Sequence, residues 1–359
     1  MRTASYIGQG RIESRDIEAI EPGPHDVRIR VAYAGICGTD LHILHGHMDH
    51  RVSAPQPIGH EMSGTVESLG SEVVGLAVGQ NVTVMPLLSC GDCPACRAGH
   101  RHICQNLDFV GIETPGAMQE LWTVPDSIVI PLPDDIDLAH AALIEPLAVA
   151  AHDVRRARLE AGETALVIGG GPIGQLIALV AARTGARVIV AEPNAERRAL
   201  AAKNGAHVVD PIGEDLAGIV QELTDGAGAD VVFEVAGIAA TALDATAHAK
   251  VRGRVVMVAI HPQPVPIDLH RIFWRELEIL GARVYEREDF ERAVALIAAG
   301  DIPAADIITD VVPLDEAARA FEALSEARAM KLLVDVRSSD VRSSDARSSD
   351  VRSHEEIPA

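Results

Sequence analysis

Residues 164–174 read Thr-Ala-Leu-Val-Ile-Gly-Gly-Gly-Pro-Ile-Gly. The first five form a continuous apolar run, which is typical of a strand buried in a parallel sheet. Three glycines follow the strand, and a helical pattern then continues to Arg183. The acidic residue Glu192 comes 23 positions after Gly169. This order of strand, glycine turn, helix and acid predicts a dinucleotide-binding fold.

Each glycine of the turn has an expected structural role. We expect Gly169 to make the turn, Gly171 to let the backbone approach a pyrophosphate, and Gly174 to allow close packing of helix and strand. The pyrophosphate would rest on the helix N-terminus. The predicted nucleotide-binding residues are Gly169, Gly171, Pro172, Ile173, Gly174, Glu192 and Arg197.

Glu192 also bears on the choice of nucleotide. Its carboxylate would accept hydrogen bonds from the adenosine ribose, whereas a 2′-phosphate would meet like charge. NAD is therefore favoured over NADP, although Arg197 and Arg198 are near enough in sequence to weaken this preference.

Strands and helices keep alternating after this turn. The further predicted strands are 187–191, 207–209, 229–235, 253–260 and 276–281, and the further predicted helices are 215–223 and 239–249. With the first strand these make six, which predicts an α/β fold with a doubly wound parallel sheet.

The segments on either side have a β-rich character. Val27, Ile29 and Val31 alternate with polar residues, the pattern of a half-buried strand. Other strands are predicted at 62–69, 80–86 and 331–336, and helical segments at 134–158, 290–299 and 314–325. A chain of 359 residues has room for about two domains.

Gly35-Ile-Cys-Gly-Thr-Asp-Leu-His42, taken with Gly59-His60-Glu61, offers a thiolate, an imidazole and a carboxylate. Zinc accepts all three ligand types, so we interpret Cys37, His60 and Glu61 as belonging to a catalytic zinc site. Cys37 falls in a glycine-flanked turn after a predicted strand, where reactive groups are often presented. The alternative for Cys37 is an inert buried thiol.

The other four cysteines are closely spaced at Cys90, Cys93, Cys96 and Cys104. Glycine and proline between them permit the tight turns that would wrap one tetrahedral ion. The spacing favours a closed, structural Cys₄ zinc site over unpaired cysteines. An iron–sulfur cluster could also use four cysteines, but nothing else in the chain indicates electron transfer.

Two further features leave alternatives open. His42, His45, His47 and His50 could form another metal site, but spacing alone favours a solvated loop at the rim of the zinc site, with the exception of His42, to which the family resemblance below gives another role. Glu145 stands in an apolar run before Pro146, where a new helix is expected to start. It is either paired or bound to metal, or a solvent-facing charge at a helix N-terminus.

Composition excludes several classes of function. The formal net charge of −21 argues against nucleic acid and against an anionic membrane surface as partners. There is no secretory signal pattern and no apolar run of about 20 residues. Five cysteines do not suit a disulfide framework, so the cytoplasm is the expected compartment. A Val-Arg-Ser-Ser-Asp repeat predicts a flexible tail over 337–359.

Over about residues 1–336 these motifs resemble the medium-chain, zinc-dependent alcohol dehydrogenase family. The resemblance implies a GroES-like catalytic domain over 1–148 and 285–336, with a Rossmann NAD-binding domain over 149–284. It implies that Cys37 and His60 hold the catalytic zinc and that Asp40 supports it. Thr39 and His42 match the family's proton relay.

The resemblance also raises the interest of Glu145. Polyol, butanediol and sugar dehydrogenases of this family carry Glu in an Ile-Glu-Pro context, as here. Glu61 and Glu145 are therefore both candidates for the remaining zinc ligand. Sorbitol dehydrogenases have a substrate-binding arginine at about the position that aligns with Val284 of this chain, next to Arg283. Residues 285–291 of this chain look more like threonine 3-dehydrogenases.

The expected function is reversible, zinc-dependent and NAD-linked oxidation of a secondary alcohol in a polyol, vicinal diol, sugar or cyclitol. The alternatives are an L-threonine 3-dehydrogenase, an amino-sugar or aminocyclitol dehydrogenase, and a non-catalytic zinc- and nucleotide-binding protein of the same fold. The family resemblance implies two zinc ions per subunit and a homo-oligomer, a tetramer rather than a dimer.

Overall fold

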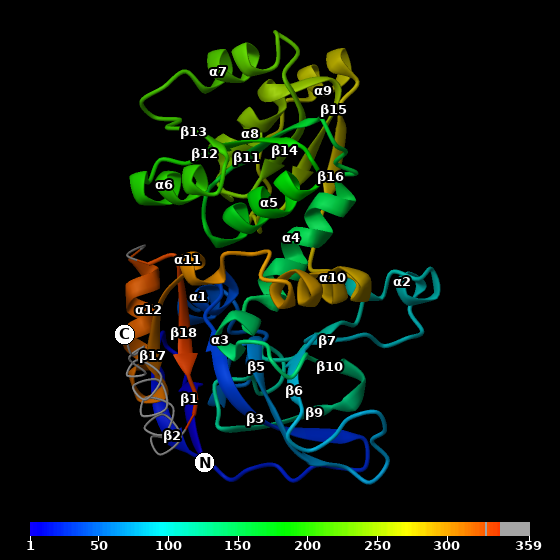
Figure 1. Cartoon of the computed structure of the whole chain (residues 1–359), viewed down its shortest axis with the longest axis vertical. Coiled ribbons are helices and arrows are strands. Elements are labelled where there is room, and N and C mark those ends of the chain that lie inside the picture. The colour runs from blue at the N-terminus through cyan, green and yellow to red at the C-terminus, as the bar shows by residue number, and fades with distance from the viewer. Residues whose placement is uncertain (327–328, 338–359) are drawn as a thin grey trace, which may run out of the picture. The chain divides into compact units, whose positions relative to one another are not determined.

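The computed structural model describes residues 1–326 and 329–337, which form two compact units (Figure 1). The first unit comprises Met1–Leu88, Asp108–Leu143 and the described residues from Ile308 on; the second comprises Ser89–Leu107 and Ile144–Ile307. The second unit thus includes the cysteine-rich segment and residues 285–307. The domain boundaries expected at 148 and 285 stay a prediction, and the tail predicted over 337–359 lies outside the described residues from 338 on.

Within its described residues, the second unit contains a six-stranded parallel sheet in the order β13-β12-β11-β14-β15-β16. The prediction of a doubly wound parallel sheet is confirmed. The strand order reverses on either side of β11, so the glycine turn follows the strand at the switch point, where such sheets bind ligands. The strands are β11 Thr164–Ile168, β12 Arg187–Ala191, β13 His207–Val209, β14 Ala229–Glu234, β15 Ala249–Met257 and β16 Glu278–Gly281.

Helices cover this sheet, and close packing fixes the first of them, α5 (Pro172–Arg183). A Cβ added to Gly174 would lie only 1.9 Å from the carbonyl oxygen of Gly169, so glycine is needed for this approach. The other helices of the unit are α2 Pro94–Arg97, α4 Ile144–Arg156, α6 Ala195–Lys203, α7 Leu216–Leu223, α8 Ala239–His248, α9 Leu269–Arg275, α10 Arg287–Ala298 and α11 Ala304–Ile307, with a short 3-10 helix at Arg101–Ile103.

The first unit is built around β3 (Asp26–Gly35), a ten-residue strand in which Val27, Ile29 and Val31 are fully buried. The order of its main sheet is β10-β6-β5-β3-β18-β17, and β9 also pairs with β3. The remaining strands are β1 Arg2–Tyr6, β2 Ile12–Asp16, β4 Gln56–Pro57, β5 Glu61–Leu69, β6 Asn81–Val84, β7 Leu87–Leu88, β8 Asp108–Phe109, β9 Leu121–Pro125, β10 Val129–Pro131, β17 Ile308–Pro313 and β18 Lys331–Asp335.

The helices of the first unit are α1 Gly38–Leu44, α3 Leu138–Ala141 and α12 Ala317–Ser325, with 3-10 helices at Asp126–Ile128 and Leu314–Glu316. The glycine-flanked turn expected around Cys37 is followed by helix α1, so the loop expected over residues 42–50 was wrong for residues 42–44. The physical reason lies at the helix start, where the Asp40 carboxylate accepts the backbone N–H of Cys37 at 2.9 Å and satisfies a donor that the helix leaves open.

Chain pairing at the end of β3 positions the candidate site. Gly35 is in register with Glu61 of β5 on one side and with Leu333 of β18 on the other. Segments far apart in the sequence therefore meet beside the residue that precedes the Cys37 turn. Among the residues that the structure describes, no helix is long and apolar enough to cross a membrane.

Candidate active site and zinc centres

The first unit brings together the thiolate, imidazole and carboxylate that the sequence singled out. One ligand atom from each of Cys37, His60 and Glu61 lies within 4.8 Å of the others. Cys37 is the residue before α1, and His60 and Glu61 stand where β5 begins. The His60 and Glu61 side chains are almost fully buried. Sulfur, nitrogen and oxygen donors at this separation are a set that fits a zinc ion.

Asp40 supports this cluster from behind. It is fully buried, and its Oδ1 lies 3.7 Å from Nδ1 of His60, while its Oδ2 accepts the Cys37 N–H. Desolvation raises the pKa of the Asp40 carboxyl, against the opposing effects of His60 and the Cys37 N–H. The His60 ring also packs edge-on against Phe109, with centroids 5.0 Å apart. Such outer contacts fix the orientation of a ligating imidazole.

A lysine that sequence reasoning missed completes the cluster. Lys331, the first residue of β18, forms an ion pair with the Glu61 carboxylate, and both side chains are buried. Its Nζ also donates to the carbonyl oxygen of Ile36 at 3.0 Å. The sequence did offer a signal, because Lys331 is a charged residue at the start of a largely apolar strand. A charge at such a position is rarely buried without a partner, so a buried carboxylate partner could have been expected.

Thr39 and His42 both lie on α1, three residues apart, so they share one face of the helix. His42 is in its last turn and is partly exposed. Burial lowers the pKa of His42 from its ordinary value of 6.5, and the neighbouring His47 and His45 lower it further. Its imidazole is therefore neutral, and able to accept a proton, over a wider pH range than a free histidine.

The four closely spaced cysteines meet in the second unit, as their spacing predicted. Their sulfurs all lie within 4.8 Å of one another. The Sγ atoms of Cys93 and Cys104 are 3.8 Å apart, and those of Cys90 and Cys104 are 3.4 Å apart. Both distances exceed the roughly 2.05 Å of a disulfide. They suit two corners of a tetrahedral zinc site, which lie about 3.8 Å apart for a Zn–S bond of about 2.3 Å.

The electrostatics of this loop also fit a cation. The backbone N–H groups of Cys96 and Gln105 point at the Cys93 sulfur and lower its pKa to about 6. Burial instead raises the pKa of Cys96 to about 12. Four thiolates cannot gather in so small a space without a compensating positive charge, which a divalent ion such as zinc would supply.

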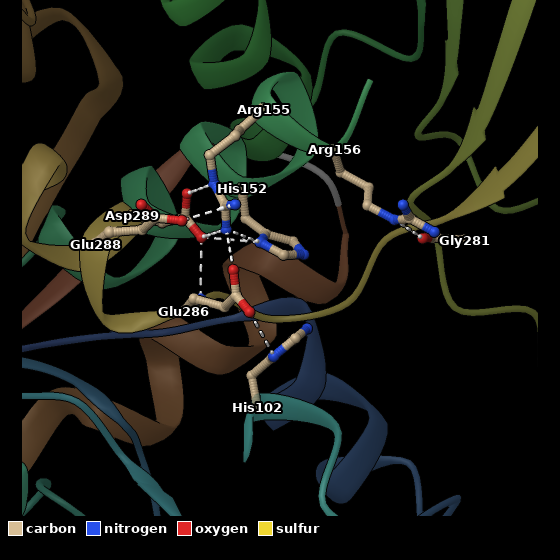
Figure 2. A network of polar contacts seen from close by, with 8 residues as sticks. All are labelled: His102, His152, Arg155, Arg156, Gly281, Glu286, Glu288 and Asp289. Atoms are coloured by element: carbon tan, nitrogen blue, oxygen red, sulfur yellow. Dashed lines mark hydrogen bonds and ion pairs between the residues drawn. The ribbon is translucent and has the colours of Figure 1, made fainter. Parts of the chain in front are cut away.

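A polar network anchors the cysteine loop within the second unit (Figure 2). Arg155 of α4 binds both oxygens of Asp289, at 2.7 and 2.8 Å, and also contacts Glu286. Glu286 in turn lies 3.5 Å from Nδ1 of His102, which belongs to the loop, and His152 contacts Asp289 at 2.8 Å. Burial alone would raise the pKa of Asp289, but Arg155 and His152 outweigh it and hold that pKa below the usual range.

His152, Glu286 and Asp289 are also close enough to one another to be considered as metal ligands. Arg155, however, already pairs with both carboxylates. A guanidinium in this position supplies the charge that a metal would otherwise bring, so the network acts as an ion-pair anchor for the loop.

Glu145 stands in the first turn of α4, which begins at Ile144, two residues before the expected start at Pro146. It is buried and accepts a hydrogen bond from the hydroxyl of Tyr285 at 2.7 Å. It is therefore the paired carboxylate of the two alternatives, and not a solvent-facing charge. The choice between Glu61 and Glu145 as zinc ligand stays a prediction.

The residues predicted to bind the nucleotide lie around the turn after β11. The Glu192 carboxylate accepts the N–H of Gly170 at 2.7 Å and that of Asn194 at 2.9 Å. Helix α5 begins at Pro172 after Gly171, and no side chain caps its N-terminus. Its free N–H groups fit a pyrophosphate. A guanidinium nitrogen of Arg197 would lie 3.9 Å from a Cβ built on Gly171, which places a cation beside the turn.

Comparisons with known proteins agree with this fold. The family model "Alcohol dehydrogenase GroES-like domain" matches residues 23–134, and the model "Zinc-binding dehydrogenase" matches residues 172–299. A 2-dehydro-3-deoxy-L-galactonate 5-dehydrogenase of Pseudoalteromonas atlantica is 52% identical over 336 residues, covering 93% of this chain and 98% of that protein. An L-threonine 3-dehydrogenase of Rhizobium etli is 37% identical, covering 89% and 94% of the two chains.

Two solved structures extend the comparison. A zinc-binding dehydrogenase from Sinorhizobium meliloti 1021, bound to NADP, superimposes with a TM-score of 0.88 at 36% identity, covering 93% of this chain and 98% of that one. The 2R,3R-butanediol dehydrogenase from Bacillus subtilis gives 0.86 at 31% identity, covering 93% and 99%. The fold and the comparisons together show that this chain is an oxidoreductase that acts on CH–OH groups. The chain belongs to the medium-chain, zinc-dependent alcohol dehydrogenase family.

Replacing Cys90 by serine tests the closed zinc site. We expect the zinc content to fall by about one ion per chain and the melting temperature to fall by several degrees, because the loop loses its cross-link. Elemental analysis and calorimetry measure both. Cys37→Ser is the matched control, and it should lose the other zinc while leaving the melting temperature less affected. Unchanged zinc in Cys90→Ser would contradict the assignment.

Replacing Lys331 by methionine tests the buried ion pair. In metal-free enzyme, removing one partner leaves the Glu61 charge uncompensated, which should lower the free energy of unfolding by about 3–5 kcal/mol. Lys203→Met is the control, since the pair of Lys203 with Asp306 is largely exposed and should contribute less than about 1 kcal/mol. Urea unfolding followed by fluorescence gives both values. Equal losses in the two variants would show that Lys331 has no special role.

Proposed function

We propose that this enzyme oxidises, reversibly and with NAD, a secondary hydroxyl of a sugar-derived substrate to the ketone. Sugar acids stand first, ahead of polyols, vicinal diols, sugars and cyclitols. The proposal rests on the convergence of Cys37, His60 and Glu61 in one cluster, in which His60 and Glu61 are buried. The named relatives and the glycine turn of the second unit support the same chemistry.

The named relatives indicate the substrate class. The 52% identical relative is named for a sugar acid oxidised at position 5, and the 37% identical relatives are named for threonine. Both substrates carry a carboxylate and a secondary hydroxyl. The higher identity favours the sugar acid. L-Threonine remains the second candidate, ahead of amino sugars and aminocyclitols, because residues 285–291 also resemble threonine 3-dehydrogenases.

The cluster can promote loss of the hydroxyl proton. A bound zinc supplies Lewis-acid chemistry, which lowers the pKa of a hydroxyl group near it. Cys37 and His60, with Glu61 or Glu145 as the further ligand, would hold the ion. Thr39 would take the proton from the substrate hydroxyl and pass it to His42, which shares its helix face. A neutral imidazole suits the final acceptor near neutral pH.

The second unit would bind the nucleotide. We propose NAD, because the buried Glu192 carboxylate stands beside the glycine turn, where it can accept the ribose hydroxyls and repel a 2′-phosphate. Arg197 beside the same turn is the feature that would favour NADP. The cytoplasmic location expected from the cysteines stays a prediction.

Oxidation assays with a substrate panel test the function. NADH absorbance should appear with the zinc-loaded enzyme and 2-dehydro-3-deoxy sugar acids, at a kcat/KM at least about tenfold above that for L-threonine, polyols or cyclitols. Preference for threonine would overturn the substrate class.

Glu192→Ser tests the choice of nucleotide. It should raise the ratio of NADP to NAD activity by about tenfold or more, since a repulsive charge is removed. NADP preference in the wild type would overturn the choice of nucleotide.

The pH profile tests the relay. His42 accepts a proton only when neutral, so turnover should fall as pH drops through its pKa, which lies below the ordinary 6.5. In His42→Ala we expect turnover about 10²-fold lower near neutral pH. The difference should narrow below the pKa of His42, where the wild-type imidazole is already protonated, and at high pH, where hydroxide takes the proton. His50→Ala, in the same segment, is the control. An unchanged profile in His42→Ala would remove the residue from the mechanism.

We also propose a homo-oligomer, a tetramer rather than a dimer. Leu269, Phe273 and Trp274 of α9 are 70%, 74% and 68% exposed, although aromatic residues are only 3% of the chain. Large exposed apolar side chains mark interaction surfaces. The strand β16 lies at an edge of its sheet, so a second copy could pair there about a two-fold axis.

Light scattering after size exclusion tests the assembly. We expect a mass of about four chains for the wild type and a smaller species for the double variant Phe273→Glu, Trp274→Glu, because two charges would be buried in the contact. Glu substitution of the exposed Val74, in the first unit, is the control. A wild-type monomer would refute the proposal, and an unaltered mass in the double variant would place the contact elsewhere.

A further inference from the structure

The residues that end α1 bring two histidine side chains together. His45 follows the last helical residue, and Gly46 comes next with a φ of +76°. The N–H of Gly46 donates to the carbonyl of Ile43 at 2.9 Å, and the N–H of His47 donates to that of His42 at 3.0 Å. This pair of bonds is the Schellman motif, which closes a helix with a glycine in the left-handed region.

The motif has a consequence for side chains. It places the residue after the glycine against the residue four positions before the glycine, and an apolar contact usually fills that place. In this chain those residues are His47 and His42. Their Nδ1 atoms lie 3.3 Å apart, and the ring centroids are 5.6 Å apart. Backbone hydrogen bonding thus holds two imidazoles side by side.

The separation of the two nitrogens suits a shared metal ion. Two nitrogen ligands of tetrahedral zinc lie about 3.3 Å apart, since Zn–N bonds are about 2.0–2.1 Å. A third imidazole is near, with the His45 ring 6.0 Å from the His47 ring. His45 and His47 are exposed, so an ion could reach them from solvent.

Asp49 adds a negative charge to the same loop. One of its oxygens accepts the hydroxyl of Tyr6 at 2.7 Å. The other would lie 3.4 Å from a Cβ built on Gly46, so the carboxylate faces the turn that holds the histidines. A nearby carboxylate favours a cation over an anion as the occupant of this loop.

We propose that His42 and His47 form a third metal site that binds a divalent transition ion such as Zn²⁺ or Ni²⁺ and thereby inhibits the enzyme. Imidazole ligands select these ions over Mg²⁺ and Ca²⁺, which prefer oxygen. The site is separate from the Cys37 cluster and from the four cysteines. Its inhibitory effect rests on the proposed function, because an ion on the His42 imidazole occupies the nitrogen lone pair that would receive the proton.

Binding is measured first, on enzyme that already carries its full zinc complement. Added Zn²⁺ or Ni²⁺, followed by titration calorimetry, should show one further site per chain. His47→Ala should weaken that site at least about tenfold through loss of one ligand, whereas His50→Ala, which removes an exposed histidine from the same segment, should leave it unchanged. Equal binding in wild type and His47→Ala, or equal weakening in both variants, would overturn the site.

Turnover is measured next, in the same preparations. The further equivalent of metal should inhibit the wild type, while His47→Ala should keep its basal turnover and resist inhibition at the same metal concentration. Binding without inhibition would leave the site standing and overturn its link to the His42 relay. If no substrate supports turnover, the proposed function fails, and calorimetry still decides whether the metal site exists.

Discussion

The pairing of β3 with two different strands is the constraint on which the candidate site depends. At Gly35 the strand meets Glu61 of β5 on one side and Leu333 of β18 on the other. Cys37 follows two residues later, and Lys331 lies two residues before Leu333. A shift of one residue in either pairing would turn Glu61 or Lys331 to the opposite face of the sheet and break the cluster.

Compensation of buried charge is the common theme of the polar sites. Glu61 is paired with Lys331, Asp289 with Arg155, and Glu145 receives the Tyr285 hydroxyl. Each buried carboxylate is costly unless such a partner is present. The four cysteine sulfurs also lie close together, but the negative charge of their thiolates would have to be compensated by an ion. The three carboxylates thus have partners within the chain, whereas the clustered cysteine sulfurs would need an ion.

Sequence reasoning reached the fold and most of the candidate residues. The apolar run 164–168 and its glycine turn predicted the parallel sheet, because a strand buried on both faces and a tight turn both leave local signals. Helix α1 was missed, since it is short and starts after a cysteine, which is not a usual capping residue. Lys331 and Tyr285 were missed as partners of Glu61 and Glu145, because those contacts depend on long-range packing that no local pattern encodes.

Cys37 and His60 are proposed to hold a zinc ion distinct from the one held by the four cysteines. Anomalous diffraction at the zinc absorption edge, from crystals of the purified enzyme, tests it most directly. We expect two zinc peaks per chain: one within about 2.3 Å of the Cys37 sulfur and about 2.1 Å of a His60 nitrogen, and one among the four cysteine sulfurs. A single peak among the cysteines, in crystals of enzyme that turns over its substrate, would contradict it.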